Sequence, residues 1–152
     1  ELAPAAVGRT RTHDPSLRGD ATRWLEAGAS EAQDALLARL DALRTALNGA
    51  AYLGLADVEA HFALYPPGAR YARHRDRFRD DDRRTVSLVC YLNEDWDPGR
   101  DGGALRLYDA GDTAHDVAPL GGRAVVFLSE LEHEVLPATR DRFSVAAWLL
   151  RR

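Results

Sequence analysis

The pattern of hydrophobic and polar positions divides the chain into one helix followed by a series of short strands. Four leucines recur at steps of four, three and four residues: Leu36, Leu40, Leu43 and Leu47. This spacing predicts an amphipathic helix with one apolar stripe, which we expect to pack on the outside of a sheet. Ser30 and Gln33 have the spacing of a capping box at its start, and Asn48-Gly49 predicts its end.

After this helix the pattern changes to short alternating or apolar runs, separated by Gly, Pro, Asn and Asp. The runs that predict strands are 58–65, 71–76, 85–92, 104–108, 115–118, 123–128, 133–136 and 143–150. About eight short strands with such turn residues between them are typical of a β-sandwich or jelly roll. We therefore expect a mainly β (α+β) fold, in which residues 58–150 form a jelly roll, or double-stranded β-helix, and residues 21–50 form a helical support.

The first twenty residues show no sustained periodicity, and we expect them to form a flexible arm. Asp20 predicts the cap of a short helical turn over residues 21–26. The triplet Arg18-Gly19-Asp20 is also the integrin-binding tripeptide, and we interpret it here as a chance match. A chain of 152 residues is long enough for one hydrophobic core, so we expect a single domain over residues 1–152.

Composition excludes several classes of protein. With 45% hydrophobic and 29% charged residues the chain is not expected to be disordered, and a net charge of −4 gives no reason to expect a nucleic-acid partner. No apolar run approaches the roughly 18 residues of a membrane span. The single cysteine, Cys90, excludes an intramolecular disulfide and favours a reducing, cytoplasmic location. The chain contains no Lys, Ile or Met, a bias that favours a GC-rich bacterial source.

The candidate chemistry is a metal site. His74 and Asp76 are two residues apart, so in an extended strand their side chains project from the same face. His133 opens a later strand and could supply a second imidazole. Two histidines and one carboxylate are the ligand set of non-haem Fe(II) oxygenases, and this set leaves coordination positions open for a co-substrate and oxygen.

Other residues indicate what accompanies the metal. Arg142 follows His133 by nine residues, and a buried guanidinium at this point would need an anion, for which its planar fork suits a carboxylate. The hydroxyls of Tyr65 and Tyr91 could bind a dicarboxylate. His61 lies one strand upstream and could face the same pocket. Cys90 alternates to the face opposite Tyr91, which favours a packing role.

Four blocks of this sequence resemble the 2-oxoglutarate-dependent prolyl hydroxylases, particularly the hypoxia-sensing type and its bacterial relatives. Residues 65–76, from Tyr-Pro-Pro-Gly to His-Arg-Asp, resemble their first metal-ligand block. Residues 89–96 are similar to their Tyr-Leu-Asn-x-x-Trp block, and residues 102–107 to their Gly-Gly-x-Leu-Arg strand. Residues 133–148 are similar to the segment that carries the distal His, the co-substrate Arg and a following Trp. The resemblance extends from about residue 18, whose Arg-Gly-Asp segment is similar to one before the leading helix in this group, to the C-terminus.

The resemblance implies a ligand set and a reaction. His74, Asp76 and His133 would hold Fe(II), and Arg142 would pair with the distal carboxylate of 2-oxoglutarate, helped by Tyr91 and Tyr65. The enzyme would convert 2-oxoglutarate and O2 to succinate and CO2, with ascorbate as reductant, and hydroxylate a prolyl residue at its 4-position in a partner protein. Trp148 would form the wall on the substrate side, and Arg84 and His61 would belong to the same substrate pocket.

The charged loop 77–84 is short and departs from the family pattern, so substrate specificity does not carry over, and a translation factor is a guess at the partner. Two alternatives stay open. One is a 2-oxoglutarate oxygenase that acts on a free amino acid or other small molecule. The other is a cupin-like metal-binding sensor without turnover, which would have no need of a buried cation at Arg142.

Overall fold

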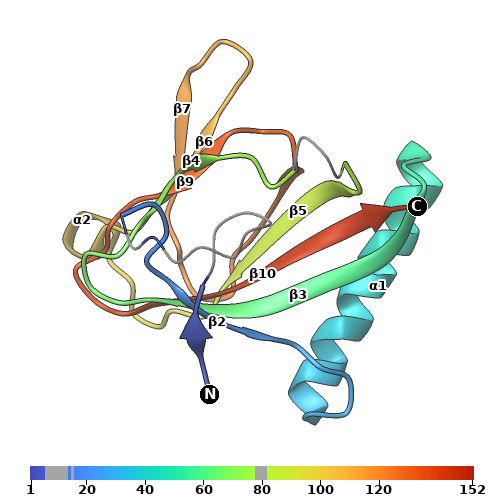
Figure 1. The fold of residues 1–152 in the computed structure, drawn as a ribbon, viewed down its shortest axis with the longest axis horizontal. Coiled ribbons are helices and arrows are strands. Elements are labelled where there is room, and N and C mark those ends of the chain that lie inside the picture. Colours follow the sequence, from blue (N-terminus) through green and yellow to red (C-terminus); the bar gives the residue numbers. More distant parts are fainter. Residues whose placement is uncertain (6–13, 15, 78–81) are drawn as a thin grey trace.

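Two antiparallel sheets enclose the core in the computed structural model of the chain, and one long helix lies against the larger sheet (Figure 1). The structure describes residues 1–5, 14, 16–77 and 82–152. The larger sheet contains, in spatial order, β1 (Ala3–Pro4), β2 (Ala21–Trp24), β3 (Leu55–Tyr65), β10 (Arg142–Arg151), β5 (Arg84–Tyr91) and β8 (Ala124–Leu128). The smaller sheet contains β4 (Tyr71–His74), β9 (His133–Val135), β6 (Leu105–Tyr108) and β7 (Ala114–Val117). The helices are α1 (Glu31–Ala51) and α2 (Pro98–Asp101).

The central core lies between the two sheets. Its buried side chains come from strands of both: Ala63, Tyr65, Tyr91, Leu105, Phe127 and Val135. Because successive strand residues face opposite sides, the same strands send a second set of apolar side chains outward. The prediction of a mainly β fold with short antiparallel strands is confirmed, and every predicted strand lies within about three residues of an observed one.

Helix α1 covers the outer face of the larger sheet, as its leucine stripe predicts. Leu40 is buried against strands β3, β5 and β10, and Leu36, Leu43 and Leu47 pack beside it. Ser30 is the N-cap, and its hydroxyl accepts a hydrogen bond from the backbone N–H of Gln33. The predicted end at Asn48-Gly49 is wrong, because the helix continues to Ala51. The Asn48 side chain instead hydrogen-bonds the backbone N–H and carbonyl of Leu55, which ties the helix to the start of β3.

The N-terminal part departs from the prediction. Residues 21–24 form strand β2 and not a helical turn, because their backbone pairs with β3 and, on the other side, with β1. The Asp20 carboxylate does not cap a helix; it accepts two hydrogen bonds from the Arg18 guanidinium. With β1 paired and Ala5 buried, the described residues at the start of the chain belong to the larger sheet rather than to a loose arm. Residues 6–13 and 15 lie outside the described residues.

The connections between strands differ in how far they extend from the core. The hairpin of β6 and β7 projects away from the rest of the molecule, and β7 is mostly exposed (Figure 1). The predicted charged loop 77–84 lies partly outside the described residues, which omit 78–81. In the described part of the chain, no helix combines the length and the apolar character that crossing a bilayer requires.

Candidate metal centre and its pocket

The three predicted metal ligands meet at the open end of the smaller sheet. His74 ends β4 and His133 begins β9, and the two residues are direct partners in the antiparallel pair. Asp76 lies two residues beyond β4, with each carboxylate oxygen 3.5 Å from the Nε2 of one histidine. The three ligand atoms all lie within 4.8 Å of one another. This is the donor set of a non-haem Fe(II) centre, and the positions of these atoms fit one metal ion.

The tautomer of both histidines is set by the backbone. Nδ1 of His74 lies 2.7 Å from the carbonyl oxygen of Ala72, and Nδ1 of His133 lies 2.9 Å from that of Leu131. A carbonyl oxygen only accepts, so each Nδ1 carries the hydrogen. In the neutral ring each Nε2, which faces Asp76, therefore carries the lone pair that a metal ligand requires.

The electrostatics of the triad favour a cation. Burial by itself would raise the pKa of the Asp76 carboxyl, but the His133 and His74 rings lower it well below its usual range. Burial lowers the pKa of His74. Burial also opposes the charged form of His133, yet the Asp76 carboxylate outweighs it and raises the pKa of His133. The Asp76 carboxylate thus stabilises a positive charge on the neighbouring imidazole, and a metal ion can take the place of the proton that carries this charge.

The structural reason for this convergence differs from the sequence argument. Strand alternation over residues 71–76 predicts that His74 and Asp76 share a face, but β4 ends at His74 and Asp76 lies in a bend. The Asp76 carboxylate accepts a hydrogen bond from the hydroxyl of Ser87, a residue of β5 in the larger sheet. The expectation that the two side chains lie together is confirmed, but strand alternation is not the reason, because Asp76 lies outside the strand.

Arg142 lies at the start of β10, and its side chain is fully buried at 1% exposure. Its Nε donates to the carbonyl oxygen of Gly103 at 2.8 Å, while its Nη2 makes no hydrogen bond within the described residues. In that part of the chain no carboxylate forms an ion pair with it. Burial lowers the pKa of Arg142, but guanidinium remains charged in proteins. A buried cation without an anion is costly, so this position indicates a ligand that carries the negative charge.

The rings of the two predicted tyrosines both lie next to this guanidinium. Its central carbon is 5.3 Å from the ring centroid of Tyr65 and 5.2 Å from that of Tyr91. The Tyr91 hydroxyl is buried and, like Arg142 Nη2, has no hydrogen-bond partner among the described residues. Burial raises the pKa of both phenols, so both hydroxyls are neutral donors at physiological pH. Two unpartnered donors side by side suit one carboxylate.

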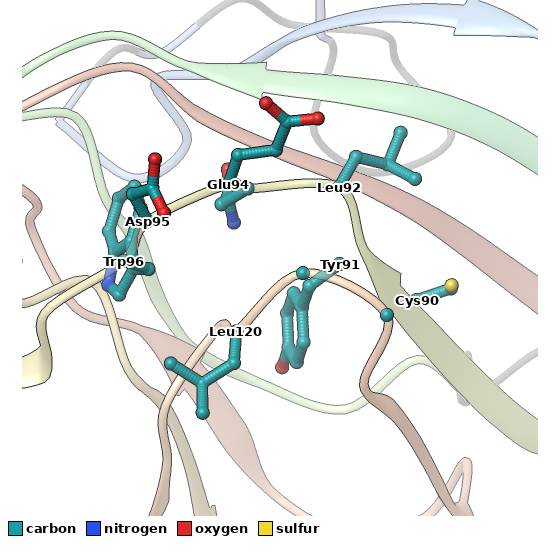
Figure 2. A pocket seen from close by; sticks show the side chains of 10 residues that line it. Cys90, Tyr91, Leu92, Glu94, Asp95, Trp96 and Leu120 are labelled. Carbon is teal, nitrogen blue, oxygen red and sulfur yellow. The ribbon is translucent and has the colours of Figure 1, made fainter.

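A cavity of about 520 Å³ connects these groups. Eight of the nine predicted site residues line it: His61, Tyr65, His74, Asp76, Arg84, His133, Arg142 and Trp148. The ninth, Tyr91, borders a second, more open hollow of about 670 Å³ at the end of β5 (Figure 2). Its neighbour Cys90 packs toward α1, as strand alternation predicts.

Aromatic and basic side chains form the outer wall of the cavity. The His61 ring lies between the rings of Trp24 and Trp148, with centroid distances of 5.2 and 5.1 Å. The Arg84 guanidinium stacks on Trp148 at 3.7 Å and pairs with the Glu59 carboxylate. Burial, followed by the nearby cation of Arg18, lowers the pKa of His61 to about 4, so its imidazole is neutral. Because its Nδ1 faces the carbonyl oxygen of Phe62, the hydrogen is on Nδ1 and Nε2 is an acceptor.

Several residues of the site were missed by sequence reasoning. Arg18 and Tyr71 line the cavity, and the Tyr71 ring stacks on the ligand His74 at 3.6 Å. The Arg18 guanidinium covers the other side of Tyr71 at 4.7 Å. Residues three apart in a regular strand face opposite sides, so the sequence did not predict that Tyr71 contacts His74. The contact forms because β4 is irregular between the two residues. Arg18 and Asp20 were noted only as a chance tripeptide and as part of a segment similar to one in the family, and neither observation predicted their ion pair.

Comparisons with known proteins agree with this geometry. A solved Pseudomonas putida prolyl-4-hydroxylase is 54% identical, with a TM-score of 0.91 over 100% of this chain and 78% of that one. A Trichoplax adhaerens prolyl hydroxylase, solved in complex with a peptide of the hypoxia-inducible factor oxygen degradation domain, is 26% identical, with a TM-score of 0.89 over 98% of this chain and 70% of that one. These similarities confirm the predicted double-stranded β-helix.

Curated sequences give the same relationship. The human protein Egl nine homolog 1 is 34% identical over 150 residues, which cover 93% of this chain and 35% of the human one. The chain spans 13% to 64% of the length of the curated relatives that it matches. Residues 60–150, which include all nine predicted site residues, match the model of the 2OG-Fe(II) oxygenase superfamily. The chain therefore belongs to the 2OG-Fe(II) oxygenase superfamily.

Proposed function

We propose that this chain is a 2-oxoglutarate- and Fe(II)-dependent dioxygenase that hydroxylates a prolyl residue, at its 4-position, in a partner protein. The reaction would consume 2-oxoglutarate and O2 and release succinate and CO2, with ascorbate as reductant. The observation that carries the proposal is the buried guanidinium of Arg142, which has no carboxylate partner among the described residues and lies in the same cavity as the metal-ligand triad. The similarity to prolyl hydroxylases supports the choice of substrate.

The residues divide into those that hold the metal and those that hold the co-substrate. His74 and His133 offer neutral Nε2 atoms and Asp76 offers a carboxylate oxygen, so these three would hold Fe(II), leaving positions open for a co-substrate and oxygen. The bound iron supplies the activation of O2. Arg142, with the Tyr91 and Tyr65 hydroxyls, would bind the distal carboxylate of 2-oxoglutarate. Because these three side chains are buried away from water, the charge of Arg142 would attract the carboxylate more strongly than at the surface.

The outer wall suits a peptide. Trp148 Nε1 is buried and has no hydrogen-bond partner among the described residues, so it is free to donate to a bound ligand. The neutral Nε2 of His61 is an acceptor on the neighbouring ring. A peptide backbone offers both a carbonyl and an N–H, and Trp24, which also lines the cavity and is 51% exposed, continues the aromatic surface toward solvent. The identity of the partner, such as a translation factor in the cytosol of a bacterium, stays a prediction.

The test is to incubate the protein with Fe(II), 2-oxoglutarate, ascorbate and a mixture of peptides from a bacterial lysate. We expect some peptides to gain about 16 Da on a proline, the mass of one added oxygen, and the gain to disappear in His74→Ala. Turnover confined to free amino acids or other small molecules would replace the protein substrate by the first alternative. Tight metal binding with no turnover on any compound would favour the cupin-like sensor and overturn the proposal.

A further inference from the structure

Asp76 differs from the two histidines of the triad in how it is held. His74 and His133 are fixed by paired strands, whereas Asp76 lies in a bend after β4. We propose that Ser87 and Ser129 are positioning residues, which orient the Asp76 carboxylate for metal binding through a chain of two hydroxyls. The proposal concerns the metal site alone and does not depend on which substrate is hydroxylated.

The direction of both hydrogen bonds follows from the chemistry. Ser87 Oγ lies 2.7 Å from Asp76 Oδ2 and 2.9 Å from Ser129 Oγ. A carboxylate that binds a metal ion is ionised and has no hydrogen to donate, so Asp76 can only accept. Ser87 therefore donates its one proton to Asp76, and Ser129 must donate to Ser87. The chain of donors ends on the carboxylate.

Both serines are rigidly placed. Ser87 lies within β5 opposite Phe127 of β8, and Ser129 follows the end of β8; their exposures are 1% and 0%. The backbone N–H of Ser129 donates to the carbonyl of Thr85, and its carbonyl accepts from the N–H of Arg77. Ser129 thus joins the larger sheet to the bend next to Asp76. The larger sheet positions the carboxylate, while the smaller sheet positions the two imidazoles.

This arrangement has a consequence for metal affinity. The hydroxyl of Ser87 occupies one lone pair of Oδ2 and so restrains rotation of the carboxylate about its Cβ–Cγ bond. A restrained carboxylate keeps an oxygen directed at the point where the two Nε2 atoms converge. Outer contacts of this kind typically change metal affinity by about 10- to 100-fold. We expect loss of the Ser87 hydroxyl to weaken metal binding within this range.

The experiment compares two substitutions of equal shape. Ser87→Thr keeps a hydroxyl and Ser87→Val replaces that hydroxyl by a methyl group, so both add bulk to the buried position. Co(II) is titrated into each protein in the absence of 2-oxoglutarate, and the dissociation constant and visible absorption bands of the bound ion are measured. Ser30→Ala serves as the stability control, because it removes the N-cap of α1 far from the triad.

We expect Ser87→Thr to bind Co(II) within about threefold of the wild type, and Ser87→Val to bind about 10- to 100-fold more weakly with shifted bands. Ser129→Ala leaves the Ser87 donor in place and should cause a smaller loss, and Ser30→Ala should cause none. Equal Co(II) affinity in the Thr and Val variants, whether both normal or both weak, would overturn the proposal. If Ser87→Val does not fold, Ser87→Ala takes its place in the same comparison.

Discussion

The neutral histidine in the outer wall of the cavity gives a quantitative prediction for stability. His61 is only 4% exposed and lies between two tryptophan rings. Burial and the nearby cations of Arg18 and Arg84 lower its pKa from 6.5 to about 4. The perturbation that tests this is His61→Phe, which keeps an aromatic ring in the same place and removes the titrating group.

The magnitude follows from the two pKa values. Between pH 6.5 and pH 4 the unfolded chain binds a proton at His61 that the folded protein does not, so stability falls as the pH is lowered. A shift of one pKa unit corresponds to about 1.4 kcal/mol. Because pH 5 lies between the two pKa values, only part of the full effect is reached there. The wild type should have lost about 2 kcal/mol of stability at pH 5 relative to pH 7.5.

The assay is urea unfolding of the metal-free wild type and His61→Phe at pH 7.5 and pH 5.0. Every other titrating group is present in both proteins, so its contribution cancels in the difference between them. We expect the free energy of unfolding of His61→Phe to rise relative to the wild type by about 2 kcal/mol on going from pH 7.5 to pH 5.0. A difference that stays constant with pH would refute the reasoning, since His61 would then be accessible to protons in the folded state.

Other substitutions test single contacts. Tyr91→Phe removes a buried hydroxyl that has no partner among the described residues, so urea unfolding should show no loss of stability. The Kd for 2-oxoglutarate should rise about tenfold, and an unchanged Kd would show that Tyr91 does not bind the co-substrate. Gly121→Ala would place a Cβ 2.3 Å from the carbonyl oxygen of Asn93, so urea unfolding should show a loss of about 2 kcal/mol or more in the free energy of unfolding. Gly122→Ala has open space around the Cβ but a φ of +80°, so the loss should be about 1 kcal/mol. Trp148→Phe removes an N–H without a partner among the described residues and shrinks a buried ring that stacks with Arg84 and His61, so we expect a raised KM for the peptide and a lower urea midpoint; an unchanged KM would place the peptide elsewhere.

Most of the fold could be predicted from the sequence because its signals are local. The leucine stripe gave α1, and the short runs between turn residues gave the strands. The prediction was wrong where a long-range pairing overrides a local preference. Residues 21–24 become a strand because β3 presents an open edge to them, and Asn48 does not end α1 because its amide binds Leu55. Neither partner is visible from the neighbouring sequence.

The site shows the same division. The positions of His74, Asp76, His133 and Arg142, together with the resemblance to the prolyl hydroxylases, predicted eight side chains that line the cavity, but not Arg18 or Tyr71. The serines that orient Asp76 were not predicted, since they come from β5 and from the end of β8, and buried serines have no distinctive spacing. A polar side chain that acts through another residue can be identified only when the sheets are in place.

The most direct test of the central claim is the conversion of 2-oxoglutarate to succinate, measured for the wild type, Arg142→Ala and Arg140→Ala. The two arginines are two residues apart, but Arg140 is exposed and stacks on Trp96, so its removal is the matched control. We predict Fe(II)-dependent succinate from the wild type and Arg140→Ala, and at least a tenfold higher 2-oxoglutarate requirement for Arg142→Ala. Equal dependence on 2-oxoglutarate in all three proteins, or no succinate from any of them, would contradict the account.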